Sequence, residues 1–79
     1  MKTFKVTYAG NCFKLRNFEA IINAPNERQA VEKAYSERME YNYFPQGDGV
    51  IRDCDNNIIA LPDHNSISFN GGYFIAEEI

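Results

Sequence analysis

The sequence predicts a small α+β domain in which an antiparallel β-sheet carries one amphipathic helix packed on one face, in the order β-β-α-β-β-β-β. Residues 26–35 have the pattern of a self-capped helix, because Asn26 can cap the first free amides and Gln29 stands three residues further on. The segments on both sides alternate polar and apolar residues with the period of β-strands. At 79 residues the chain has room for one core, so we expect a single domain over residues 1–79.

The first two strands are predicted to form a hairpin. Residues 3–8 alternate polar and apolar side chains, as in a strand with one buried face and one wet face. Gly10-Asn11 supplies a turn, and the alternation resumes over residues 12–24. It changes register near Asn17, where we expect a bulge or bend.

The helix is expected to face the sheet with one apolar arc. On a helical projection this arc spans about 140° and contains Ala30, Val31, Ala34, Tyr35 and Tyr41. Arg38 falls inside the same arc, so its charged end must reach solvent or a partner. The helix must end before Pro45.

Four more strands are expected after the helix, in two hairpins. Residues 50–54 and 58–61 flank a turn at residues 55–57. Residues 66–69 and 73–79 flank Asn70-Gly71-Gly72, which is a strong turn sequence. This order of elements predicts that the sheet is antiparallel.

Charge is distributed unevenly along the chain. The net charge is −3, but residues 1–38 carry seven Lys and Arg against four Glu, or +3. Residues 39–79 carry Arg52 alone against seven acidic residues, or −6. An acidic half disfavours nonspecific nucleic-acid binding by that half and suits a basic partner surface, although it also serves solubility.

The sequence also predicts a compartment. The first residues alternate polar and apolar side chains, and no apolar run approaches the roughly 18 residues of a membrane helix. We therefore expect a soluble cytoplasmic protein with no membrane association. Cys12 and Cys54 are expected to be reduced and largely buried. A single disulfide bond between them is the alternative if the protein is exported.

No motif in the chain predicts an enzyme, a metal site or a cofactor. Residues 53–64 begin like a calcium-binding loop, but Ile58 and His64 stand where that loop needs glycine and glutamate. His64, the single histidine, has no Ser or Cys in a nucleophile context. Adjacent Glu77 and Glu78 point to opposite faces of a strand, which disfavours a carboxylate pair acting as acid and base.

A protein-binding role fits the aromatic content. The chain has five tyrosines and six phenylalanines, which is generous for a core of this size. Tyrosines after the helix, rimmed by acidic residues, would form a credible interface, although they could also form a small core under the loop. The predicted partner-binding residues are Glu40, Tyr41, Tyr43, Asp48, Asp53 and Asp55. The expected partner is a larger protein with a basic surface.

Two other functions stay open. The first hairpin interleaves aromatic residues with Lys5, Lys14 and Arg16, a combination that can hold single-stranded nucleic acid. Phe4 and Tyr8 lie on the strand face opposite Lys5, however, so nucleic acid is the less favoured partner. A homodimeric structural or assembly subunit is the other possibility, with residues 73–79 as the expected exposed edge strand.

The segment from Phe18 to Ala34 has a pattern that is also found in a known group of small proteins. It is a strand that ends in alanine and is followed by a capped helix, Phe18-Glu19-Ala20-Ile21-Ile22-Asn23-Ala24-Pro25-Asn26-Glu27-Arg28-Gln29-Ala30 and on to Ala34. This segment resembles the strand-to-helix join of small phage-encoded β-β-α proteins, among them anti-CRISPR inhibitors. The resemblance implies a non-enzymatic, stoichiometric inhibitor in the host cytoplasm. Such an inhibitor would occlude a basic, nucleic-acid-binding surface of a host defence or transcription protein.

Overall fold

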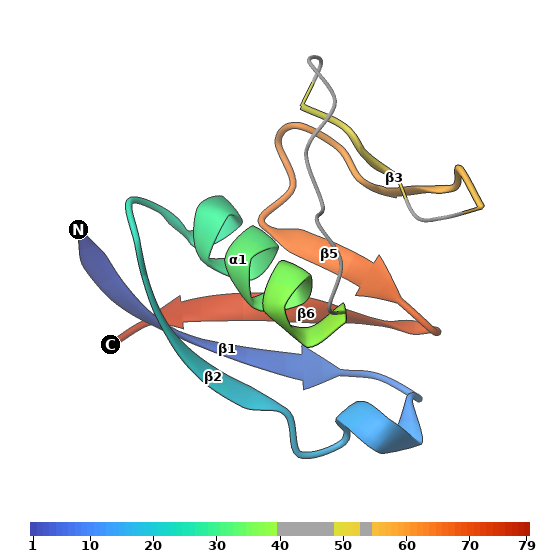
Figure 1. Ribbon diagram of the computed structural model, residues 1–79, viewed down its shortest axis with the longest axis horizontal. Helices are drawn as coiled ribbons and strands as arrows, with labels where there is room; N and C mark the ends of the chain where they lie inside the picture. Colours follow the sequence, from blue (N-terminus) through green and yellow to red (C-terminus); the bar gives the residue numbers. More distant parts are fainter. Residues whose placement is uncertain (40–48, 53–54) are drawn as a thin grey trace.

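A computed structural model of the protein describes residues 1–39, 49–52 and 55–79, with the backbone alone at residues 38 and 39. The described elements follow the predicted order, and the α+β class is confirmed (Figure 1). They are β1 (Lys2–Ala9), the short 3-10 helix η1 (Phe13–Leu15), β2 (Glu19–Ala24), α1 (Glu27–Met39), β3 (Ile51–Arg52), β4 (Ile58–Ala60), β5 (Ser66–Phe69) and β6 (Gly72–Glu78).

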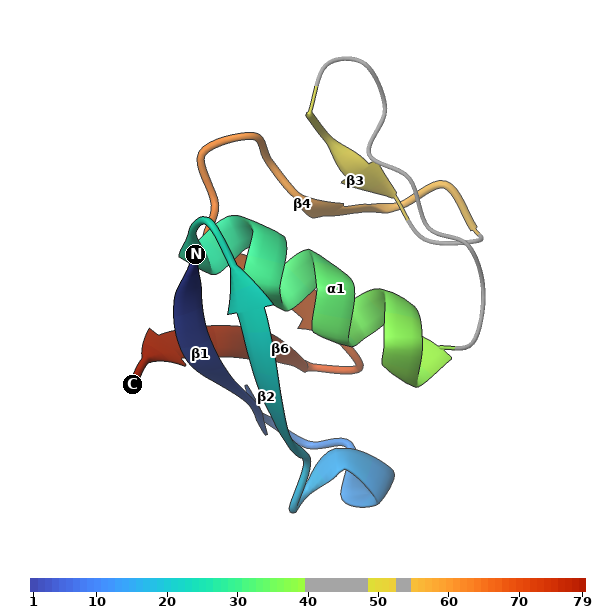
Figure 2. The ribbon, with the colours of Figure 1, turned by 60° about the vertical axis from the view of Figure 1, so that its left-hand side comes forward.

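The main layer is a four-stranded antiparallel sheet in the order β2-β1-β6-β5. Figures 1 and 2 show α1 lying against one face of this sheet. The hairpin of β3 and β4 forms a separate two-stranded sheet, and β4 packs beside β5. No helix in the described part of the chain is both long and apolar enough to cross a membrane.

The last strand lies inside the sheet, which corrects the prediction that residues 73–79 form an exposed edge. β6 pairs with β5 on one side and with β1 on the other. The hairpin turn between β5 and β6 is visible in the sequence, but the pairing of β6 with β1 joins opposite ends of the chain and has no local signal. The edge strands are therefore β2 and β5.

The connection from β1 to β2 also differs from the prediction. Residues 13–15 form η1, where Leu15 is buried and Phe13 is 80% exposed, so they do not continue a strand with one apolar face. The Phe18 amide donates to the Leu15 carbonyl at 3.0 Å and closes the turn. This turn at residues 16–17 is the bend expected near Asn17. β1 and β2 then pair without a register shift, so the described ladder contains no bulge there.

The core lies between α1 and the sheet. The predicted apolar arc is confirmed at Ala30, Val31, Ala34 and Tyr35, which are each at most 1% exposed. Tyr41 and the side chain of Arg38 fall outside the described residues. From the sheet, the Phe74 ring packs edge to face against three other rings, with centroid distances of 5.2 Å to Tyr8, 5.3 Å to Phe18 and 5.8 Å to Tyr35.

Local signals placed the helix start and the last hairpin correctly. The Gln29 amide donates to Asn26 Oδ1 at 2.9 Å, which is the predicted N-cap. Asn70 and Gly71 both have positive φ, 47° and 77°, as a two-residue type I′ turn requires. Gly72 then lies so close to β1 that an added Cβ would be 2.4 Å from the Ala9 carbonyl oxygen.

Candidate binding surfaces

The predicted tyrosine and acidic surface falls almost wholly outside the described residues. Asp55 is described, and it is exposed in the connection between β3 and β4. The remaining members, Glu40, Tyr41, Tyr43, Asp48 and Asp53, lie outside the described ranges. That surface therefore stays a prediction.

A second candidate is the face of the four-stranded sheet opposite α1, here called the helix-free face. The strand period of two divides each strand between the core and this face. Among the described residues, no helix or strand covers it, and its side chains range from half-buried to exposed. Its members are Thr3, Lys5 and Thr7 from β1, Glu19, Ile21 and Asn23 from β2, Tyr73, Ile75 and Glu77 from β6, and Ser66 and Ser68 from β5.

Large apolar side chains lie exposed on the helix-free face. Ile21 is 59% exposed, Tyr73 is 44% exposed and Ile75 is 38% exposed. Ile75 stands in the middle of the sheet, opposite Thr7 on one side and Ser66 on the other. The face thus combines apolar groups with hydroxyls, a composition suited to contact with another protein.

The sequence held a signal for this face. The runs Ala20-Ile21-Ile22 and Tyr73-Phe74-Ile75-Ala76 are apolar at consecutive positions, so both faces of these strands carry apolar groups. Alternation with polar residues, as in β1, would have placed polar groups on the outer face. These interruptions of the period-two pattern are the sequence signal that distinguishes the helix-free face from a polar outer face.

Charge on the helix-free face is partly neutralised. Lys5 Nζ lies 3.7 Å from a carboxylate oxygen of Glu19. Lys5 also stands opposite Glu77 in the pairing of β1 with β6. Glu77 forms no ion pair with another described side chain, so the face carries one uncompensated negative charge.

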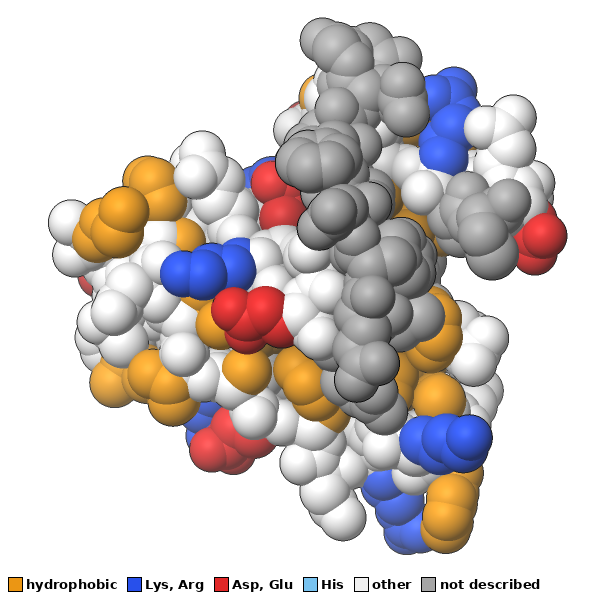
Figure 3. All heavy atoms as spheres, in the orientation of Figure 1, with side chains coloured by type: hydrophobic (Ala, Val, Ile, Leu, Met, Phe, Trp, Pro, Cys, Tyr) orange, Lys and Arg blue, Asp and Glu red, His pale blue; other side chains and the backbone are white. Residues whose placement is uncertain are grey.

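A third candidate is the η1 corner, defined as Phe13, Lys14, Arg16, Asn17 and Phe18. These residues line an open hollow of about 560 Å³. Lys14 and Arg16 are exposed, and neither forms an ion pair with another described residue. Figure 3 shows Lys and Arg side chains beside hydrophobic ones at the lower right, over η1.

Two of the three predicted nucleic-acid contacts therefore meet at one place. Lys14, Arg16 and the exposed ring of Phe13 line the same hollow at the η1 corner. Lys5 does not join them, because it lies in the middle of β1 on the helix-free face. Phe4 and Tyr8 are buried in the core, as their position opposite Lys5 predicted.

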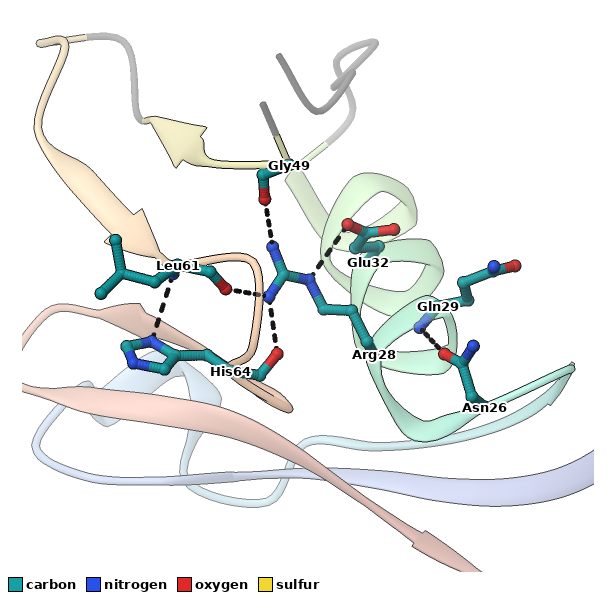
Figure 4. A network of polar contacts seen from close by, with 7 residues as sticks. All are labelled: Asn26, Arg28, Gln29, Glu32, Gly49, Leu61 and His64. Carbon is teal, nitrogen blue, oxygen red and sulfur yellow. Dashed lines mark hydrogen bonds and ion pairs between the residues drawn. The ribbon is translucent and has the colours of Figure 1, made fainter. Parts of the chain in front are cut away.

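Arg28 forms a network that the sequence analysis did not predict (Figure 4). Its Nη1 donates to the carbonyl oxygens of Leu61 at 2.5 Å and His64 at 2.6 Å, and its Nη2 donates to that of Gly49 at 3.0 Å. Its Nε is 3.1 Å from Glu32 Oε1. The spacing of four between Arg28 and Glu32 could have indicated this pair, but the carbonyl partners lie far away in sequence.

The Arg28 network is structural in character. The guanidinium joins the first turns of α1 to the segments before β3 and after β4. His64 lies in the loop between β4 and β5, where its Nδ1 accepts the Leu61 amide at 3.2 Å. Arg28 therefore fixes the separate β3–β4 sheet to the helix.

The described residues contain no group of three or more His, Cys, Asp or Glu side chains that could hold a metal ion. Cys12 is a free thiol of intermediate burial, and Cys54 falls outside the described ranges. Comparisons of the chain with protein families, with characterised proteins and with solved structures gave no match.

Proposed function

We propose that this protein is a non-enzymatic binding protein that acts by covering a surface of a larger protein. The observation that carries the proposal is the helix-free face, where Ile21, Tyr73 and Ile75 are exposed on the same strands that build the core. A sheet face with apolar centres and a polar surround is the kind of surface that another protein can bury.

The charge of the chain favours a basic partner. The net charge is −3, and Glu77 adds an uncompensated carboxylate to the helix-free face. A basic surface that normally holds nucleic acid would be complementary to this protein. The proposal thus agrees with the resemblance to phage-encoded inhibitors, and it places the action in the host cytoplasm, against a defence or transcription protein.

The test compares capture of a partner by the wild type and by two variants. Each protein is immobilised, a nuclease-treated bacterial lysate is passed over it, and retained proteins are identified by mass spectrometry. The double variant Tyr73→Ser/Ile75→Ser removes the apolar centre of the helix-free face. The matched control is Ile58→Ser, because Ile58 is 53% exposed but belongs to β4, outside the four-stranded sheet.

We expect one protein to be retained in stoichiometric amount by the wild type and by Ile58→Ser, and to be lost from Tyr73→Ser/Ile75→Ser. Equal retention by all three proteins would contradict a role for the helix-free face. Loss from a variant that circular dichroism shows to be unfolded would not count as loss of binding.

A second candidate function rests on the η1 corner. Phe13 is 80% exposed and lines the same hollow as the two cations, and an exposed aromatic ring beside phosphate-seeking groups can hold a single strand by stacking. Fluorescence anisotropy with a labelled single-stranded oligonucleotide tests this candidate. Phe13→Ala should weaken binding at every salt concentration, whereas Lys14→Ala and Arg16→Ala should weaken it and flatten its salt dependence.

Lys33→Ala is the control for this second test, because Lys33 is exposed on α1 and belongs to neither surface. An oligonucleotide that binds the wild type and all four variants equally would exclude the η1 corner as the site.

A further inference from the structure

The outer edge of β2 is open. β2 is the first strand of the sheet and pairs with β1 on its inner side alone. Figure 1 shows β2 at the lower edge of the sheet, with no described element running beside it. The other edge strand, β5, has β4 packed against it. The described chain thus leaves one edge of the four-stranded sheet without a neighbour.

The register shows which backbone groups point outward from β2. The Ile79 amide donates to the Thr3 carbonyl at 2.9 Å, so Thr3 points its backbone groups toward β6. In an antiparallel ladder the direction alternates along the strand. Residues 3, 5 and 7 therefore face β6, and their partners in β2 turn their amides and carbonyls away from β1. Those partners are Glu19, Ile21 and Asn23.

These outward groups are regularly spaced and unprotected. Glu19, Ile21 and Asn23 have no backbone hydrogen bond to any described segment beyond β2. β2 contains no proline and no bulge, and Glu19 is its one charged residue. Natural edge strands are usually blocked by such devices, and an edge without them is a template for another strand.

We propose that β2 pairs with β2 of a second copy of this chain, antiparallel about a two-fold axis at Ile21, to form a continuous eight-stranded sheet. In this register Ile21 exchanges two backbone hydrogen bonds with Ile21 of the partner subunit. Glu19 lies opposite the partner subunit's Asn23, and the symmetry repeats this pair on the other side of the axis.

The side chains of β2 favour a second copy as the occupant. The axis brings together the two Ile21 side chains, which are 59% exposed in the single chain. Each Glu19 carboxylate faces an Asn23 amide, so no like charges stand directly opposite one another. The edge is therefore complementary to itself in both hydrogen bonding and charge.

Neighbouring registers pair fewer of the three outward-facing residues of β2. A shift of two residues toward the start of β2 pairs Ile21 with Glu19 and leaves Asn23 opposite residue 17, outside the strand. A shift the other way places Glu19 opposite Pro25, which has no amide hydrogen to donate. The register centred on Ile21 is the one that engages all three outward positions of both copies.

Sedimentation velocity over a range of protein concentrations tests the proposal. The wild type should sediment as a dimer. Ile21→Lys and Ile21→Glu each place two like charges directly opposite at the axis, so each variant should raise the dimer dissociation constant by about tenfold or more. Ile58→Lys, at an isoleucine of similar exposure in β4, should dimerise like the wild type.

Mixing the two charged variants makes the test specific for the register. An equimolar mixture of Ile21→Lys and Ile21→Glu should dimerise again, because a lysine then faces a glutamate across the axis. The mixture also shows that the variants are folded. A wild type that stays monomeric at millimolar concentration would overturn the proposal. So would dimerisation that Ile21→Lys and Ile58→Lys leave equally intact, or a mixture that stays monomeric.

Discussion

The two faces of the four-stranded sheet are made from alternate residues of the same strands, yet they differ completely in environment. In β6, Phe74 is 0% exposed and packs among aromatic rings, whereas its neighbours Tyr73 and Ile75 are 44% and 38% exposed. Neighbouring apolar residues therefore have different roles. Burial under α1 makes the core face the source of stability, and the helix-free face remains available to a partner.

The largest expected effect comes from the centre of the covered face. Phe74→Ala should lower the free energy of unfolding by about 3–5 kcal/mol, because it removes a fully buried ring and leaves a cavity. A domain of this size has only about 4–12 kcal/mol of stability in total, so this variant should be close to unfolding. Urea denaturation followed by circular dichroism measures the change. A loss below about 1 kcal/mol would show that the two faces do not differ as described.

The Arg28 network should be the next most sensitive feature. Arg28→Ala leaves Glu32 and the carbonyl oxygens of Gly49 and His64 without their arginine donor, and we expect a loss of about 2–3 kcal/mol. The Leu61 carbonyl oxygen also loses Arg28 but still accepts the His64 amide at 3.0 Å. Arg28→Lys should recover only part of this loss, since a single ammonium cannot reproduce the planar set of donors. Thermal unfolding of both variants checks the prediction. Full recovery by lysine would contradict the proposed geometry.

A substitution at Gly72 tests the close contact between the end of β1 and the start of β6. A Cβ at this position would lie 2.4 Å from the Ala9 carbonyl oxygen and 2.5 Å from the Gly10 Cα. Gly72→Ala should therefore cost about 1–3 kcal/mol through overpacking. Gly71→Asn is a suitable comparison, because asparagine tolerates the positive φ of 77° and an added Cβ meets nothing closer than 3.5 Å. Equal stability of the wild type and Gly72→Ala would contradict the close contact.

The smallest of these stability effects belongs to the helix cap. Asn26→Ala removes the acceptor of the Gln29 amide and should cost about 1 kcal/mol. Asn26→Ser should retain most of the stability, because a serine hydroxyl can accept the same hydrogen bond. Chemical denaturation of the three proteins in parallel measures this difference, and an alanine variant as stable as the wild type would exclude the cap.

The sequence predicted those parts of the fold that local chemistry decides. The cap at Asn26, the apolar arc of α1 and the turn at Asn70-Gly71 each depend on residues a few positions apart. The pairing of β6 with β1 joins residues some 70 positions apart in the register Phe4 to Glu78, so its position inside the sheet had no local signal. The prediction of a strand over residues 12–15 is wrong. It assumed that Phe13 and Leu15 share one buried face, but Phe13 is exposed and Leu15 alone is buried.

The candidate sites were predicted less completely. Lys14 and Arg16 line the same hollow, as two residues only two positions apart can, whereas Lys5 lies elsewhere because its place depends on the direction of β1. The carbonyl partners of Arg28 carry no side-chain signature, so no sequence pattern could reveal that network. The helix-free face could have been inferred from consecutive apolar residues in β6.

The most direct test of the account is the affinity of Tyr73→Ser/Ile75→Ser for the protein that the wild type captures, measured by surface plasmon resonance. Both side chains are partly exposed, so the variant should stay folded, at a cost of about 1–3 kcal/mol for the apolar contacts and strand propensity that it loses. We expect its affinity to fall by about tenfold or more. A folded variant that binds as tightly as the wild type would show that the helix-free face is not the binding surface.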